Sequence, residues 1–188
     1  MAYIALRLGL VVGIALLVVG AFLGWEHYRN KRLQEQSYKE YEIRKLLGAE
    51  NYQKALEQIK NFPDGPFKPL ALSYELYIAQ VGSQKIDELK VLEQMVKSLK
   101  DPELLALYKE RYAFALFKEG KNQEALRLLE EIKEKDFNYY SALLLKAQIL
   151  EKEGKRQEAI NIYRLVAEKQ KDKYLGNLAK SFLLEGGT

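Results

Sequence analysis

The chain has 188 residues and a formal net charge of only +4, from 30 Lys and Arg against 26 Asp and Glu. The two signs are interspersed, without a basic stripe or an acidic tail, so we expect no nucleic-acid partner. The sequence has no Cys, a single His (His27) and no phosphate-binding glycine loop. Because the usual nucleophile–base and zinc sites cannot be assembled from these residues, we predict a protein that is not an enzyme and uses no metal or cofactor.

The first feature along the chain is an apolar run at residues 8–25, which contains no Asp, Glu, Lys or Arg. As a helix it would rise roughly 27 Å, close to the ~30 Å thickness of the hydrocarbon layer of a membrane. The run predicts a single transmembrane anchor over residues 1–28, followed by a second domain over residues 29–188. A cleaved signal peptide is the alternative, because Val19-Gly20-Ala21 would pass as a small-residue cleavage site.

Four glycines of this run share one side of the predicted helix. At about 100° per residue, Gly9, Gly13, Gly20 and Gly24 fall within roughly 60° of one another. Two GxxxG steps on one face allow another helix backbone to approach closely in lipid. We interpret the strip as a helix-packing face for a homodimer, and so a homo-oligomer, or for a larger membrane complex. The alternative is that glycine is simply common in membrane helices.

Two stretches in the second half of the chain are nearly identical. The nine residues from Lys118 match the nine from Lys152 at seven positions, at an offset of 34 residues. A period of 34 is that of the tetratricopeptide repeat, which pairs two helices. Gly120 and Gly154 would end the first helix of a pair, and a small residue would let the second helix press against its partner. This position of the second helix recurs at Ala55, Leu89, Ala125 and Ala159, which are 34, 36 and 34 residues apart.

Helical patterns fill the rest of the chain, and no β pattern stands out. Asp101 before Pro102 is typical of an N-cap followed by proline at the first helical position. The predicted helices cover residues 31–47, which can continue the membrane helix, 52–61, 69–81, 86–99, 102–118, 123–134, 139–152, 157–169 and 174–184. The predicted fold class is therefore all-α: one N-terminal transmembrane helix, then a tetratricopeptide-like helical solenoid of about four helix pairs with a C-terminal capping helix.

The helix predicted at residues 102–118 is apolar over more than half of its circumference. A helix in the middle of a solenoid packs on two sides, which accounts for most of these residues, and a binding groove would account for the remainder. On tetratricopeptide geometry we expect the concave, partner-binding surface to contain Tyr74, Ile78, Phe114, Phe117 and Gln148. For each of these residues, ordinary packing in the core is the alternative.

Several pieces together carry a family resemblance: the anchor ending at Gly24-Trp25, the segment Lys100-Asp101-Pro102-Glu103-Leu104, and the Gly and Glu-Ala motifs at 120–125 and 154–159. In this order the chain resembles, over essentially its whole length, the bacterial membrane-anchored tetratricopeptide family known as the ancillary Sec-translocon subunit. The resemblance implies a periplasmic domain on the bacterial inner membrane, beside the Sec channel. It also implies work with a periplasmic chaperone on emerging client polypeptides. The charges that flank the apolar run are nearly balanced and leave its orientation open.

Two functions remain open at this point. The first is a scaffold of the export machinery that holds a chaperone or a client segment. The second is an assembly adaptor of another envelope complex, of the cytochrome-maturation or pilus type, that reads one fixed peptide. A groove for many clients should be apolar and tolerant, whereas a reader of one peptide should carry charged clamps at fixed places. The aromatic residues of the predicted groove favour the first function.

Overall fold

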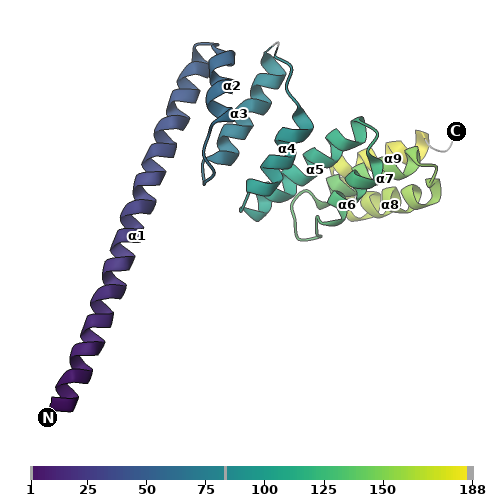
Figure 1. Cartoon of the computed structure of the whole chain (residues 1–188). Coiled ribbons are helices and arrows are strands. Elements are labelled where there is room, and N and C mark those ends of the chain that lie inside the picture. The colour runs from purple at the N-terminus through teal and green to yellow at the C-terminus, as the bar shows by residue number, and fades with distance from the viewer. Residues whose placement is uncertain (1, 83, 186–188) are drawn as a thin grey trace. The chain divides into compact units, whose positions relative to one another are not determined.

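The structure, a computed structural model, describes the backbone of residues 2–82 and 84–185 and the side chains of residues 13–82 and 84–184. Every regular element in the described part is an α-helix, so the predicted all-helical class is confirmed (Figure 1). The helices are α1 (Ala2–Gly48), α2 (Tyr52–Lys60), α3 (Lys68–Val81), α4 (Glu88–Ser98), α5 (Pro102–Lys118), α6 (Asn122–Glu130), α7 (Tyr139–Lys152), α8 (Arg156–Lys169) and α9 (Tyr174–Glu185).

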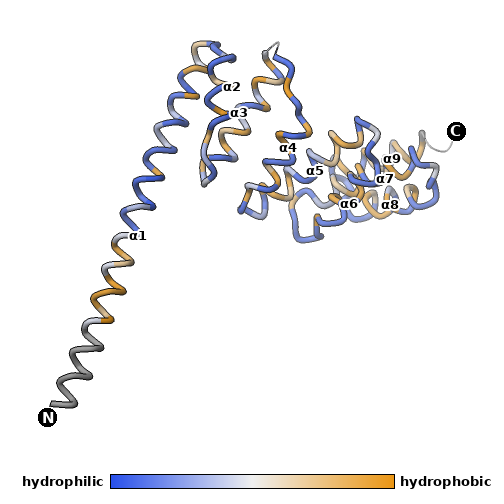
Figure 2. The backbone as a smooth tube through the Cα atoms, in the orientation of Figure 1, coloured by the Kyte–Doolittle hydropathy of each residue, from blue (hydrophilic) through white to orange (hydrophobic). Residues whose placement is uncertain are grey.

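The prediction of an N-terminal transmembrane helix is wrong. In the described part of the chain, no helix is both long enough and apolar enough to cross a membrane. Residues 8–25 do belong to α1, but its described apolar stretch runs only from Gly13 to Trp25 before Glu26 follows (Figure 2). The side chains of residues 8–12, which the prediction also used, lie outside the described residues.

Local capping signals set the starts of several helices. Asp101 is the N-cap of α5, as predicted, and its Oδ1 accepts hydrogen bonds from the backbone N–H groups of Glu103 at 3.0 Å and Leu104 at 2.9 Å. Asp87 caps α4 in the same way, accepting from the N–H of Lys90 at 3.1 Å. These carboxylates satisfy N–H groups that have no partner inside the helix.

The ends of α5 and α7 explain why the repeat needs glycine. Gly120 and Gly154 have φ angles of 77° and 78°, in the left-handed region. In both cases the N–H of the residue after the glycine donates to a carbonyl five residues earlier at 2.9 Å, which closes the same helix-ending motif in both repeats. The end of α1 has the corresponding turn with Glu50 at φ 55°.

The chain divides into two compact units, residues 1–74 and 75–188. In the first unit, α1 packs against α2. Polar side chains of α1 also form hydrogen bonds with residues 64–74, which follow α2 in the chain. Gln36 donates from Nε2 to the carbonyl oxygen of Asp64 at 3.1 Å, and an Arg32 guanidinium nitrogen donates to the same oxygen at 3.1 Å. Further along α1, Glu40 accepts a hydrogen bond from the hydroxyl of Tyr74 at 2.5 Å.

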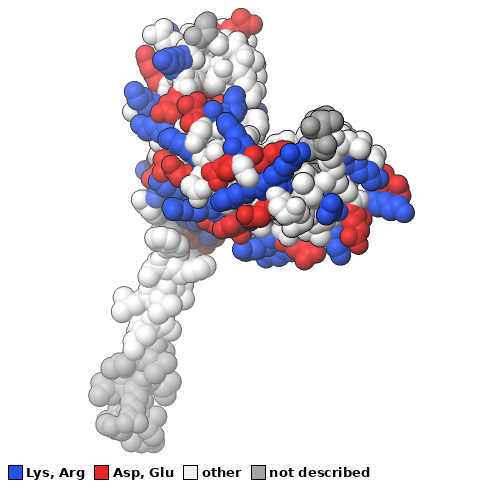
Figure 3. Space-filling view, turned by 90° about the vertical axis from the view of Figure 1, so that its right-hand side faces the viewer, with Lys and Arg blue, Asp and Glu red and all other residues white. Residues whose placement is uncertain are grey.

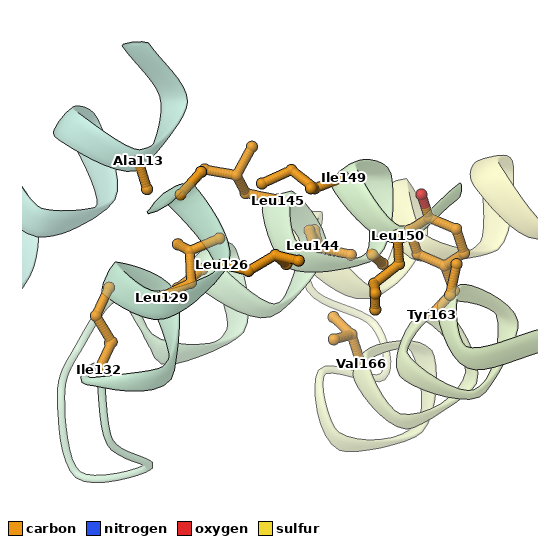
Figure 4. Packing of buried hydrophobic residues seen from close by; sticks show 14 of the residues in the cluster. Ala113, Leu126, Leu129, Ile132, Leu144, Leu145, Ile149, Leu150, Tyr163 and Val166 are labelled. Carbon is orange, nitrogen blue, oxygen red and sulfur yellow. The ribbon is translucent and has the colours of Figure 1, made fainter. Parts of the chain in front are cut away.

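The second unit is organised around one apolar core. Helices α5 and α6 pack together, as do α7 and α8, and α9 packs on α8 as the predicted cap. The apolar side chains of α7 lie between those of α6 on one side and Tyr163 and Val166 of α8 on the other (Figure 4). Ala125 and Ala159, the predicted small residues of the two matching repeats, are fully buried at these helix contacts. Lys146 of α7 forms an ion pair with Glu130 of α6 at 3.1 Å.

Candidate functional site

A solvent-open groove with a volume of about 580 Å³ lies in the second unit, along α5, α7 and α9. The volume falls within the roughly 300–1,000 Å³ that is usual for binding pockets. Each helix contributes side chains spaced three or four residues apart, so one face of each helix forms the surface. The lining residues are Leu107, Glu110, Arg111, Phe114, Phe137, Asn138, Ser141, Leu144, Leu145, Gln148, Tyr174, Leu175, Leu178 and Phe182.

One end of the groove is fixed by a polar network between α5 and α7. The Glu110 carboxylate accepts a hydrogen bond from Nδ2 of Asn138 at 2.7 Å and another from the hydroxyl of Ser141. The same Asn138 nitrogen donates to the carbonyl oxygen of Ala106 at 3.0 Å. Because both carboxylate oxygens of Glu110 are engaged inside the unit, this side chain positions the two helices rather than offering a free acid.

At the opposite end of the groove, Phe182 packs on a buried tyrosine, Tyr163. The ring of Phe182, on α9, packs against the ring of Tyr163, on α8, with centroids 5.2 Å apart. Tyr163 is almost completely buried, and its hydroxyl donates to Oε2 of Glu151 at 3.1 Å. Burial, followed by the nearby Glu151 charge and this hydrogen bond, raises the pKa of the Tyr163 phenol. The phenol therefore stays protonated as a donor, and the ring gives Phe182 a fixed support.

Three aromatic side chains of the groove are left largely open to solvent. Phe114 is 49% exposed, Phe137 is 65% exposed and Tyr174 is 78% exposed. Large aromatic rings contribute most to binding when they are buried by a partner, and such exposed clusters on a concave surface mark interaction sites. The arrangement can bury apolar side chains of another polypeptide.

The structure brings together only part of the predicted groove. Phe114 and Gln148 line it. Phe117, on the same helix as Phe114, is partly buried against the apolar core, with the Nζ of Lys152 at 4.9 Å from its ring centroid. Ile78 is fully buried, and Tyr74 belongs to the first unit, where it bonds Glu40. Whether any of these residues contacts a partner stays a prediction.

Sequence reasoning missed two of the three exposed aromatics. Phe137 lies in the polar turn before α7, between Asp136 and Asn138, and Tyr174 begins α9. An aromatic residue inside a polar turn has no evident packing role, and this was the available signal. Their meeting in one groove depends on the stacking of three helices, which no local pattern encodes.

The predicted glycine face has no packing role within the described chain. A Cβ built at Gly13, Gly20 or Gly24 would meet no atom within 4 Å. Gly9 lies outside the residues whose side chains are described. The proposal that these glycines contact another helix stays a prediction, and its membrane setting falls with the anchor.

The groove offers contacts for binding rather than a reactive group. Its charged side chains are Glu110, engaged as above, and Arg111, whose guanidinium lies 3.6 Å from Glu88. In the part of the chain that the structure describes, no cluster of His, Asp or Glu is arranged to hold a metal ion. Acidic and basic side chains are interspersed over the face shown in Figure 3, in keeping with the sequence pattern.

Comparison with known proteins agrees with the repeat. The sequence profile of the family described as a tetratricopeptide repeat-like domain matches residues 5–182. An uncharacterized protein of Aquifex aeolicus (strain VF5) is 30% identical over 134 residues, which cover 71% of this chain and 68% of that protein. Among solved structures, the TPR-like repeats of a Podosopora anserina protein described as a kinesin light chain align with a TM-score of 0.54. They share 18% identity, over 82% of this chain and 85% of that one, a likeness of fold alone.

Proposed function

The chain belongs to the tetratricopeptide repeat-like domain family, and from this premise we propose that it is a non-enzymatic scaffold that holds a segment of a partner polypeptide in the groove of α5, α7 and α9. Stacked helix pairs use their concave surfaces for binding. The observation that carries the proposal is the exposure of Phe114, Phe137 and Tyr174 around this one apolar groove.

The free energy of binding that one aromatic side chain should contribute is large enough to measure. Full burial of an aromatic side chain stabilises a complex by ~1.5–3 kcal/mol, and each 1.4 kcal/mol changes the dissociation constant about tenfold. Loss of the Phe114 ring should therefore weaken binding of the partner tenfold or more. Part of the gain is offset by the ordering of the bound segment, so few anchors dominate the affinity.

A narrower proposal concerns the partner and the compartment. We propose that the partner is a protein-export complex of the bacterial envelope, the Sec translocon together with a periplasmic chaperone or a client polypeptide. This proposal rests on the sequence resemblance alone. It requires the second unit to lie outside the cytoplasm, so a periplasm-active reporter fused after Thr188 should be active. Activity of a cytoplasm-restricted reporter in the same place would contradict it.

The direct test is site-specific crosslinking in cells of the source organism or a close relative. A photoreactive phenylalanine analogue in place of Phe114 or Phe137 should form crosslinks to a defined partner, identified by mass spectrometry. The same analogue in place of Leu165, an exposed residue of α8 that does not line the groove, is the matched control. Crosslinks of equal yield and identity from all three positions would contradict a binding role for the groove.

Two phenylalanines on one helix then separate binding from packing. Phe114→Ala should lower the capture of the crosslinked partner about tenfold with little change in the melting temperature. Phe117→Ala should lower the melting temperature, because this ring packs against the core, and should preserve binding by each folded molecule. If Phe114→Ala destabilised the fold and left binding intact, the groove assignment would be wrong.

A further inference from the structure

We draw no further inference here: the strongest candidate, the exposed apolar surface of α1 between Ile14 and Trp25, carries no proposal because nothing in the structure shows what covers it.

Discussion

Both units bury apolar residues, but they differ in how much polar side chains contribute to their internal packing. In the first unit α1 contributes two buried polar side chains, Gln36 and Glu40, at 3% and 7% exposure. In the second unit the packing is dominated by one continuous apolar cluster, and the buried polar residue among those described is Asn138. Apolar contacts supply stabilisation without direction, whereas a hydrogen bond has a defined geometry. The comparison therefore indicates that the second unit derives its stability from burial, and that the first derives its register from polar contacts.

The largest loss of folding stability should come from truncating a side chain of the apolar cluster. Tyr163→Ala removes a buried ring from between α7, α8 and α9 and should destabilise the second unit by ~3–5 kcal/mol. Tyr163→Phe keeps the ring and loses only the hydrogen bond to Glu151, so it should cost about 1 kcal/mol. Urea denaturation followed by circular dichroism measures both values. Equal losses for the two variants would mean that the hydrogen bond, and not burial, stabilises this unit.

Much of the helical layout could be predicted because its signals are local. Asp101-Pro102 encodes the start of α5, and Gly120 and Gly154 encode the helix ends that require a positive φ. The spacing of Ala125 and Ala159 indicated the repeat, since a small residue is needed wherever two helices press together.

The contents of the groove were harder to predict because they depend on contacts between distant residues. Tyr74 has the spacing of a groove residue, but Glu40, 34 residues earlier, binds its hydroxyl. Phe114 and Phe117 are three residues apart on one helix, yet Phe114 is half exposed and Phe117 packs against the apolar cluster, a difference that no local pattern encodes.

We expect an intermediate loss of stability when a buried polar contact of the first unit is removed. Gln36 donates to the carbonyl oxygen of Asp64 and accepts from the backbone N–H of Phe67 at 3.4 Å. Gln36→Leu leaves both backbone groups without this partner, so it should destabilise the first unit by ~1–3 kcal/mol. Hydrogen exchange followed by mass spectrometry should show faster exchange in residues 62–74 and unchanged exchange around α7 and α8.

The matched control is Arg32→Ala, which removes an exposed hydrogen bond to the same Asp64 oxygen. Because water can replace an exposed donor, this variant should have little effect on exchange. A larger effect for Arg32→Ala than for Gln36→Leu would contradict the view that buried polar contacts set the register.

The smallest effect concerns the contact between Tyr74 and Glu40, and it depends on pH. Burial, then the hydrogen bond to Glu40, raises the pKa of the Tyr74 phenol from 10.0 to about 12. Because the pKa is higher in the folded state than in the unfolded chain, the stabilisation is fully present below about pH 10 and is lost as the pH rises towards 12. Tyr74→Phe lacks both the hydrogen bond and the ionisable group.

Thermal melts of the wild type and of Tyr74→Phe should therefore differ by a constant amount up to about pH 10, equivalent to roughly 1 kcal/mol, and the advantage of the wild type should shrink steadily as the pH rises from 10 towards 12. Each variant is compared with the wild type at the same pH, which removes the titration of the other tyrosines and lysines from the difference. Tyr77→Phe, on the same helix with an exposed ring, controls for the loss of a phenol. A Tyr74→Phe difference that stayed constant to pH 12 would mean that the phenol does not act through its protonated form, and that the contact with Glu40 adds packing but no directional stabilisation.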